Sequence, residues 1–234
     1  MKRDPSYRKL RDQPDMKTAL VFGATGFIGS HLLRDLLDNP DYEQVIAVVR
    51  KPLALHHAKL TTLIGDLATL PALKPQLVAD EVFIALGTTR AHTPDEAEYY
   101  KIDHDYPVQA AEIAKANGAR SVFLVTAVGA NAGSSVFYVR TKGEVERDVL
   151  ALNFDHTHIF RPSMILGERD EDRPRERMFV AVWNVVNPLL VGPLDRYRGL
   201  TGEEIARAIT KAAQREAGKV RLYHWKQMNA LLRA

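Results

Sequence analysis

Apolar residues recur along the chain in two alternating patterns: short continuous runs, and longer stretches with helical spacing. The runs predict buried strands, and apolar residues three and four positions apart predict amphipathic helices. Strands are expected at 18–22, 44–49, 60–64, 81–86, 121–126 and 155–160, and helices at 27–38, 95–117 and 135–152. This alternation predicts an α/β fold of the Rossmann type, a doubly wound parallel sheet with helices on both faces.

The pattern changes after Arg161. The segment 168–177 is almost wholly charged and predicts a solvated loop or a substrate lid, and the apolar segment 178–190 suits core packing, a substrate pocket or a subunit interface. A helix from 201 to about 217, a strand at 219–223 and a helix at 226–232 follow. Because this part is too short for an independent domain, we expect a single domain, 17–234, with a small substrate-side lobe at 161–234.

Composition and charge exclude several classes of protein. The 234 residues contain no cysteine, so disulfides, iron–sulfur clusters and thiolate zinc sites are excluded. Residues 1–17 hold six Lys/Arg and three Asp/Glu, which accounts for the net charge of +3. We expect a disordered tail, 1–16, in preference to a nucleic-acid-binding arm. No apolar run is long enough for a membrane span, and no apolar stretch before the first strand suits a secretory leader. The absence of cysteine fits a cytoplasmic protein, which is the expectation.

A glycine-rich turn follows the first strand and opens the first helix. Gly23 permits a tight turn, Gly26 lets the backbone approach a pyrophosphate, and Gly29 allows the helix to pack closely on the strand. The helix N-terminus favours the pyrophosphate charge. The turn therefore predicts a dinucleotide site with the cofactor-binding residues Gly23, Thr25, Gly26, Phe27, Ile28 and Gly29.

The end of the second strand indicates which dinucleotide binds. NAD-binding proteins usually carry an acidic residue there for the ribose 2′-hydroxyl, but this strand is followed by Arg50 and Lys51. Because Arg50 can pair with a 2′-phosphate, we expect NADP(H) as the cofactor. Asp66 and Leu67 follow the third strand and are expected to border the adenine.

A tyrosine and a lysine share one face of the helix expected at 135–152. Tyr138 and Lys142 are four residues apart, and an ammonium beside a phenol lowers the tyrosine pKa toward the range useful for proton transfer. Thr126 ends the fifth strand and is the candidate for orienting a substrate carbonyl, whereas Ser134 and Ser135 are expected in a loop. His156 and His158 share a strand face without evident further ligands, so no metal site is expected.

Several segments resemble the short-chain dehydrogenase/reductase superfamily, and more specifically its atypical branch of Tat-interacting-protein-like members. They are the glycine turn, LGTTR at 86–90, DHDY at 103–106, YVRTKGEVE at 138–146 and FRP at 160–162. The resemblance covers about residues 17–217. It implies a Rossmann fold with NADP(H) and places Tyr138 and Lys142 in catalytic roles.

The resemblance also implies further cofactor contacts and shows two departures. Leu86, Gly87 and Thr88 would run beside the cofactor ribose together with Lys142, and the nicotinamide would be bordered by Arg161, Pro162 and Ser163. Relatives often carry paired serines where this chain has Thr126 and Ala127, and an asparagine near Asp103. Both departures put vigorous catalysis in doubt, though not cofactor binding.

Two functions follow as expectations. The first is an NADP(H)-dependent oxidoreductase that acts on a small carbonyl or alcohol, with Tyr138 as general acid or base, Lys142 as its partner and Thr126 orienting the carbonyl. The alternative is a catalytically weak NADP(H)-binding regulatory or interaction protein. The expected partner is a small-molecule substrate, with no nucleic acid or membrane. The long helices at 95–117 and 135–152 are typical of dimer faces in this superfamily, so a homodimer is compatible with both.

Overall fold

The computed structural model describes residues 16–167, 187, 190–215 and 218–234. The expected tail, the charged segment 168–177 and nearly all of the segment 178–190 therefore lie outside the described residues. The expectations for these three segments stay predictions.

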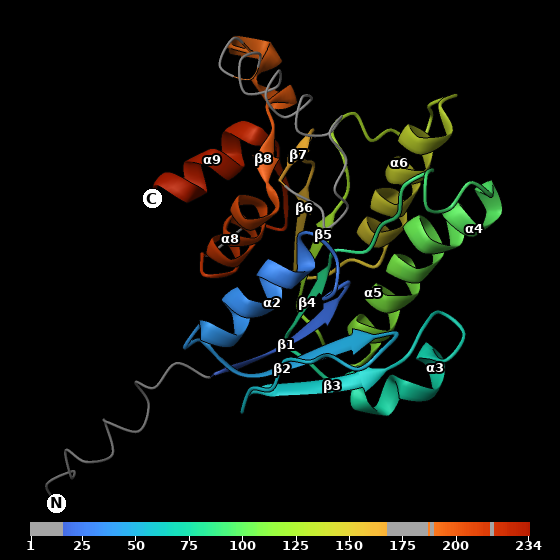
Figure 1. Ribbon diagram of the computed structural model, residues 1–234, viewed down its shortest axis with the longest axis vertical. Coiled ribbons are helices and arrows are strands. Elements are labelled where there is room, and N and C mark those ends of the chain that lie inside the picture. Colours follow the sequence, from blue (N-terminus) through green and yellow to red (C-terminus); the bar gives the residue numbers. More distant parts are fainter. Residues whose placement is uncertain (1–15, 168–186, 188–189, 216–217) are drawn as a thin grey trace, which may run out of the picture.

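A seven-stranded parallel sheet forms the centre of the molecule, with the strand order β3-β2-β1-β4-β5-β6-β9 (Figure 1). The strands are β1 (Lys17–Phe22), β2 (Tyr42–Val49), β3 (Leu60–Ile64), β4 (Glu81–Ile84), β5 (Ser121–Val125), β6 (His156–Phe160) and β9 (Val220–Tyr223). The order reverses between β1 and β4, and open α/β sheets bind ligands at such a point, outside the carboxyl ends of the strands. The predicted Rossmann fold is confirmed.

Helices cover both faces of this sheet (Figure 1). One face carries α2 (Gly29–Asp38), α8 (Gly202–Ala213) and α9 (Trp225–Arg233), which pack on one another. The other carries α3 (Leu70–Leu73), the 3-10 turn η1 (Lys74–Gln76), α5 (Tyr106–Ala116) and α6 (Phe137–Ala151). Leu32 and Leu36 of α2 are buried, as their spacing predicts. Among the described residues, no helix combines the length and the apolar composition needed to cross a bilayer.

Residues after β6 are divided between the main layers and a small ribbon. Strand β9 extends the sheet beside β6, and α8 packs beside α2 after a capping box formed by Thr201 and Glu204. Separately, β7 (Ile165–Leu166) pairs with β8 (Leu200–Thr201), and the 3-10 helix η4 (Gly192–Tyr197) precedes β8. Much of the expected lobe thus belongs to the core fold, and its substrate-side role stays a prediction.

The helix expected at 95–117 is formed by three consecutive segments. After α4 (Glu96–Tyr100), a π-helical turn, η2 (Lys101–Asp105), leads directly into α5. A π turn holds more residues than an α turn and is frequent at functional sites. Here Asp103 is the buried residue of the turn, with 1% of its surface exposed.

The glycine turn brings three elements into backbone contact. Gly23 has a φ of +85°, and a Cβ atom there would overlap the carbonyl group of Ala85, just after β4. A Cβ atom on Gly29 would likewise overlap the carbonyl group of Gly23. The turn is closed by a 2.9 Å hydrogen bond from the Gly26 amide to the Gly23 carbonyl. Only glycine allows β1, α2 and β4 to approach this closely.

We predict that Gly23→Ala destabilises the protein more than Gly118→Ala. Both glycines have positive φ, but an added Cβ at Gly118 meets no atom within 4 Å, whereas at Gly23 it meets backbone. The control variant should lose about 1 kcal/mol from conformational strain, and Gly23→Ala at least ~2 kcal/mol. Urea unfolding of both variants checks this, and equal losses would contradict the close approach of the turn to β4.

Candidate active site

The carboxyl edge of the sheet gathers most of the predicted site residues. Gly23 follows β1, Arg50 follows β2, and Gly87 lies three residues after β4. Thr126 follows β5, and Arg161 follows β6. Parallel strands end at one edge, so residues separated by over 100 positions in the sequence become neighbours there.

A buried ion pair joins Lys142 of α6 to Asp103 of the π turn. The Lys142 Nζ contacts Oδ1 of Asp103, and the two side chains are 7% and 0% exposed. The other carboxylate oxygen, Oδ2, accepts a 2.8 Å hydrogen bond from the Thr88 amide. A Cβ placed on Gly87 would lie 3.7 Å from the ammonium. The pair thus holds Lys142 against the loop that follows β4.

Tyr138 lies one helical turn before Lys142, and 42% of its surface is exposed. Partial burial raises the pKa of Tyr138, and the negative charge of Asp103 raises it further. Tyr99 of α4 is a second phenol near Tyr138, and its hydroxyl donates to the carbonyl oxygen of Thr88 at 3.3 Å. The expectation that Lys142 lowers the pKa of Tyr138 is therefore not met, because burial and the Asp103 charge act in the opposite direction.

A second buried network lies behind this edge. Glu146 of α6 accepts a 2.6 Å hydrogen bond from the Thr126 hydroxyl and a 2.9 Å bond from Nε of Arg161. A further contact between Arg161 and Glu146 makes their pairing bidentate. Because the Thr126 proton is already donated to Glu146, Thr126 cannot also donate it to a substrate carbonyl in this arrangement. The geometry thus gives no support to the expected carbonyl-orienting role of Thr126.

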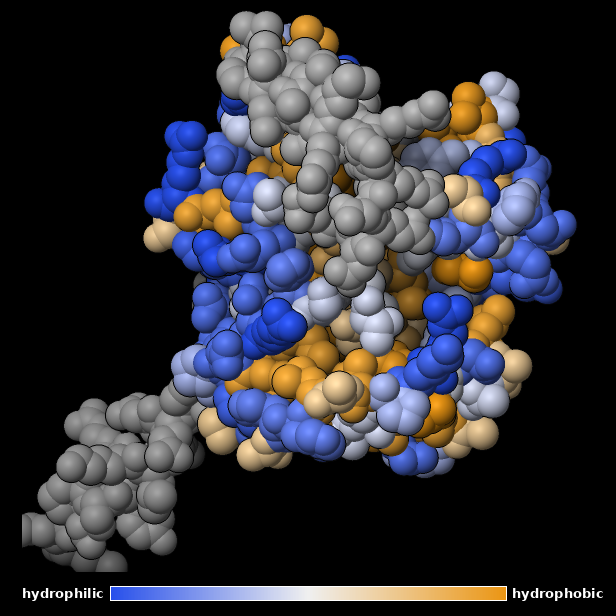
Figure 2. Space-filling model, in the orientation of Figure 1, coloured by the Kyte–Doolittle hydropathy of each residue, from blue (hydrophilic) through white to orange (hydrophobic). Residues whose placement is uncertain are grey.

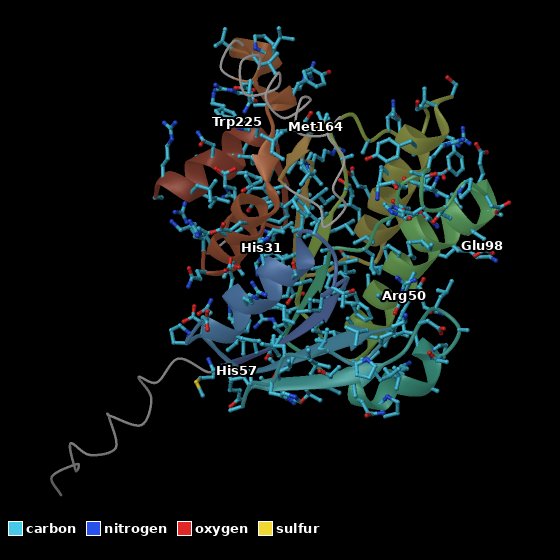
Figure 3. The ribbon with its side chains drawn as sticks, in the orientation of Figure 1. His31, Arg50, His57, Glu98, Met164 and Trp225 are labelled. Carbon is cyan, nitrogen blue, oxygen red and sulfur yellow. The ribbon has the colours of Figure 1, made fainter. Side chains whose placement is uncertain are left out.

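The ends of β2 and β3 meet beside Tyr106 of α5. Burial raises the pKa of Tyr106 to about 12, with Asp66 adding to the shift and Arg50 opposing it, so both charged groups lie near this phenol. Figure 3 shows Arg50 at the carboxyl end of β2, on the side of α5. Asp66 accepts hydrogen bonds from the amide and hydroxyl of Thr69, which lower the pKa of its carboxyl group.

The remaining predicted cofactor residues fall into two groups. Some are exposed or partly exposed at the edge, and the others are buried in or packed on the hydrophobic core. The first group comprises Thr25, Lys51, Thr88 and Ser163, and the second Ile28, Leu67, Leu86 and Pro162. The ring of Phe27 packs against the backbone of Gly167 and Gly202, since a Cβ on either glycine would collide with it.

Three contacts at the candidate site were not predicted from the sequence. They are the pairing of Asp103 with Lys142, the pairing of Glu146 with Arg161, and the hydrogen bond from the Thr88 amide. A signal for Glu146 is present, because Tyr138, Lys142 and Glu146 are spaced at four-residue intervals and so share one helix face. The interruption of a helix by a π turn leaves no comparable pattern.

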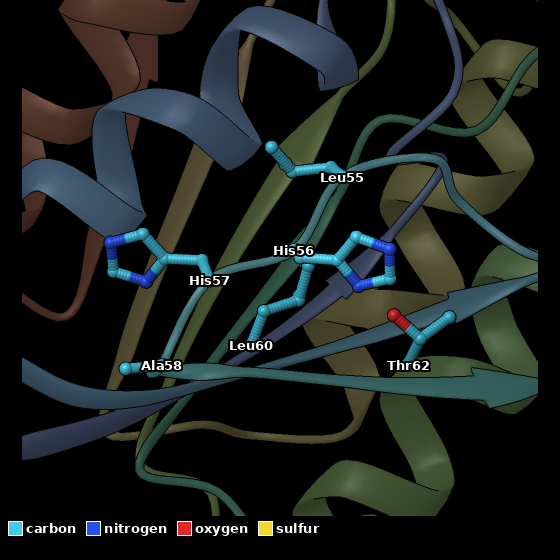
Figure 4. A pocket seen from close by; sticks show the side chains of 6 residues that line it. All are labelled: Leu55, His56, His57, Ala58, Leu60 and Thr62. Atoms are coloured by element: carbon cyan, nitrogen blue, oxygen red, sulfur yellow. The ribbon is translucent and has the colours of Figure 1, made fainter.

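Among the described residues, a cavity beside β3 lies away from this edge. It has a volume of about 400 Å³ and is lined by Leu55, His56, His57, Ala58, Leu60 and Thr62 (Figure 4). Figure 2 shows apolar residues gathered in the same region, over β2 and β3. Within the part of the chain that is described, no three histidine or acidic side chains are grouped to hold a metal ion.

Comparison with known proteins identifies relatives over most of the chain. The model of the NAD dependent epimerase/dehydratase family matches residues 19–230. Protein FMP52, mitochondrial, of Candida glabrata is 36% identical over 205 residues, which cover 87% of this chain and 88% of that protein. Protein fmp52, mitochondrial, of Aspergillus fumigatus is 36% identical over 207 residues, covering 84% and 87%.

Solved structures share the fold at low sequence identity. MoeE5 in complex with UDP-glucuronic acid and NAD has a TM-score of 0.66 at 21% identity, covering 88% of this chain and 75% of that one. The Bordetella bronchiseptica enzyme WbmH in complex with NAD+ has a TM-score of 0.67 at 17% identity, covering 90% and 76%. These likenesses confirm the fold, and the predicted dehydrogenase-type resemblance is confirmed at the level of the wider family.

The comparisons correct one expectation. The absence of cysteine and of a secretory leader favoured a cytoplasmic protein, but the FMP52 relatives are named as mitochondrial proteins. The cytoplasmic prediction is therefore wrong. A protein without disulfides or a secretory leader can still be imported into an organelle by another type of signal.

We predict that Glu146→Gln destabilises the protein by about 3 kcal/mol, because Arg161 would keep a partly buried positive charge without a carboxylate. Glu203→Gln is the matched control, since Glu203 pairs with Arg207 on the exposed surface of α8. That variant should lose less than about 0.5 kcal/mol. Thermal unfolding measures both, and similar losses would contradict the structural role of the buried pair.

Proposed function

Because the chain belongs to the NAD-dependent epimerase/dehydratase family, we propose that it is an NADP(H)-dependent oxidoreductase acting on a small carbonyl or alcohol. The observation that carries the proposal is the placement of Lys142 beside Gly87, with Tyr138 one turn earlier on the same helix. This arrangement lies at the edge where the strand order reverses.

The glycine turn fits a dinucleotide pyrophosphate. Gly26 is exposed and forms the tip of the turn, while Gly23 and Gly29 are held against backbone. Helix α2 begins at Gly29, so its N-terminal amides and dipole face the same tip. A pyrophosphate bound there would direct the adenosine toward Arg50 and Asp66 and the nicotinamide toward Lys142 and Arg161.

The residues at the nicotinamide end suit acid–base chemistry. A bound dihydronicotinamide supplies a hydride to a carbonyl carbon. Tyr138 donates its phenolic proton to the carbonyl oxygen, and Lys142 holds the ribose hydroxyls and stabilises the phenolate that forms. Glu146 holds Arg161 at the end of β6, and the Thr126 hydroxyl donates a hydrogen bond to Glu146.

Arg50 supports NADP(H) in preference to NAD(H). The residues that follow β2 are Arg50 and Lys51, both exposed, and neither is a carboxylate that could accept from a 2′-hydroxyl. A guanidinium can form two hydrogen bonds with a 2′-phosphate. Two structures that share this fold, MoeE5 and WbmH, are complexes with NAD and NAD+, which supports dinucleotide binding in this fold without deciding between NAD(H) and NADP(H).

A second candidate function follows from Thr126. Its hydroxyl is buried and donates to Glu146, so the candidate site lacks the expected donor to a substrate oxygen. This observation favours a regulatory or interaction protein that binds NADP(H) and turns over slowly. Such a protein would bind NADPH tightly, consume none across a panel of aldehydes and ketones, and bind its partner differently with and without cofactor.

We predict that Arg50→Ala weakens NADPH binding by about 1–3 kcal/mol and leaves NADH binding nearly unchanged, because only NADPH carries the 2′-phosphate. Arg221→Ala is the control, since it removes the same charge from β9 at the opposite edge of the sheet. Calorimetric titration after removal of copurified nucleotide measures all three proteins. Equal losses for both cofactors would overturn the assignment of Arg50.

We predict that Tyr138→Phe lowers kcat for carbonyl reduction by about 10²–10⁴-fold without changing NADPH affinity, because it removes the proton donor alone. Tyr100→Phe is the control, because Tyr100 stacks on His104 at 4.5 Å and has no role in the proposed chemistry. NADPH oxidation is followed with each variant and the best substrate of the panel. Full turnover by Tyr138→Phe would rule out the mechanism.

A further inference from the structure

A buried carboxylate next to the proposed catalytic lysine is unusual for a site that needs a positive charge. Asp103 is 1% exposed, and its two oxygens are held by Lys142 and by the Thr88 amide. A buried carboxylate is costly unless it is paired in this way. The pair therefore fixes the position of Lys142 before any cofactor binds.

The same carboxylate changes the electrostatics at Tyr138. A lysine ammonium alone would lower the pKa of a nearby tyrosine and favour its work as a base. With Asp103 paired to it, the ammonium lowers the pKa of Tyr138 less than an unpaired lysine would. Burial raises the pKa of Tyr138, and the negative charge of Asp103 raises it further.

We propose that Asp103 is a positioning residue that clamps Lys142 against the loop after β4 and, by its negative charge, keeps Tyr138 protonated as a proton donor. A protonated Tyr138 favours carbonyl reduction, in which it donates a proton, over alcohol oxidation, in which a phenolate must accept one. This inference rests on the proposed function, since it concerns the direction of the same reaction.

In the described part of the chain, the other polar groups around Tyr138 do not offset the negative charge of Asp103. From α4, Tyr99 faces Tyr138 as a neutral phenol. Arg90, from the loop after β4, is paired with Glu96. Arg140, on α6 itself, donates to the backbone carbonyl groups of Ser134 and Ser135. Among the described residues, Asp103 is therefore the charged group with the largest influence on the phenol.

The reductive step balances with NADPH as the reductant. A hydride carrying two electrons passes from NADPH to the carbonyl carbon, and the phenolic proton of Tyr138 passes to the carbonyl oxygen. The products are the alcohol, NADP+ and a phenolate at Tyr138, which takes a proton from water. Because a raised pKa keeps the phenol protonated up to alkaline pH, reduction is supported below that pKa and is lost above it.

The test measures the titration of Tyr138 directly, without substrate. Protein labelled with ¹³C at the tyrosine Cζ is titrated by NMR, and the Tyr138 signal is identified by its loss in Tyr138→Phe. We expect Asp103→Asn to lower the Tyr138 midpoint by about one pH unit or more, because Lys142 then acts alone. Asp105→Asn is the matched control, since it removes the same charge from the same π turn at an exposed carboxylate. An unchanged midpoint in Asp103→Asn would overturn the proposal.

A second comparison covers the case in which Asp103→Asn does not fold with Lys142 unpaired. The double variant Asp103→Asn/Lys142→Gln replaces the ion pair with two neutral side chains and leaves no buried charge. Its Tyr138 midpoint should be lower than that of Lys142→Gln, which retains the carboxylate. Equal midpoints in these two variants would also overturn the proposal.

Cofactor binding separates this inference from the proposed function. The same samples are titrated with NADPH by calorimetry. If NADPH does not bind the unaltered protein, the oxidoreductase proposal fails even when the midpoint shifts as expected. If NADPH binds and carbonyls are reduced, the alkaline limit of the pH–rate profile should move down with Asp103→Asn, and an unmoved limit would contradict the role of Asp103.

Discussion

The ion pair between Lys142 and Asp103 connects the parts of the molecule on which the candidate site depends. It joins α6 to the π turn before α5, and its carboxylate also holds the amide of Thr88 in the loop after β4. Since both side chains are almost fully buried, the pair is worth keeping only if its geometry is well satisfied. Because the two buried charges must stay paired, the fold sets the position of Lys142.

The glycine turn supplies the complementary constraint on the other side of the edge. Gly23 and Gly29 let β1, α2 and the residues after β4 approach at backbone distance. The loop after β4 therefore lies between the turn that suits a pyrophosphate and the lysine that suits a ribose. The buried leucines of α2 and the packing of α2 against α8 stabilise the position of the glycine turn.

Much of the fold could be predicted from the sequence, because buried parallel strands and amphipathic helices leave strong periodic patterns. The strand at 60–64 was predicted at its observed bounds, and the glycine turn lies where its spacing indicates. Periodicity did not show the π turn at Lys101–Asp105, because the pattern of apolar and polar residues of a helix hardly changes when one turn holds an additional residue. It also missed β7 and β8, which are two residues each.

The candidate site was predicted less completely for a related reason. Spacing along one helix identified Tyr138 and Lys142. The partner of Lys142 is Asp103 of the π turn, and the partner of Arg161 is Glu146 of α6. Each pair joins two different elements, so spacing within one element does not predict it. Thr126 ends the expected strand, yet its hydroxyl points to Glu146. Position at a strand end does not fix the direction of a side chain.

The most direct measurement is a crystal structure of the NADPH complex. We expect the pyrophosphate at Gly23–Gly29, the 2′-phosphate on Arg50, and Lys142 on the ribose while still paired with Asp103. A cofactor bound elsewhere, or a Lys142 drawn away from Asp103, would contradict this expectation.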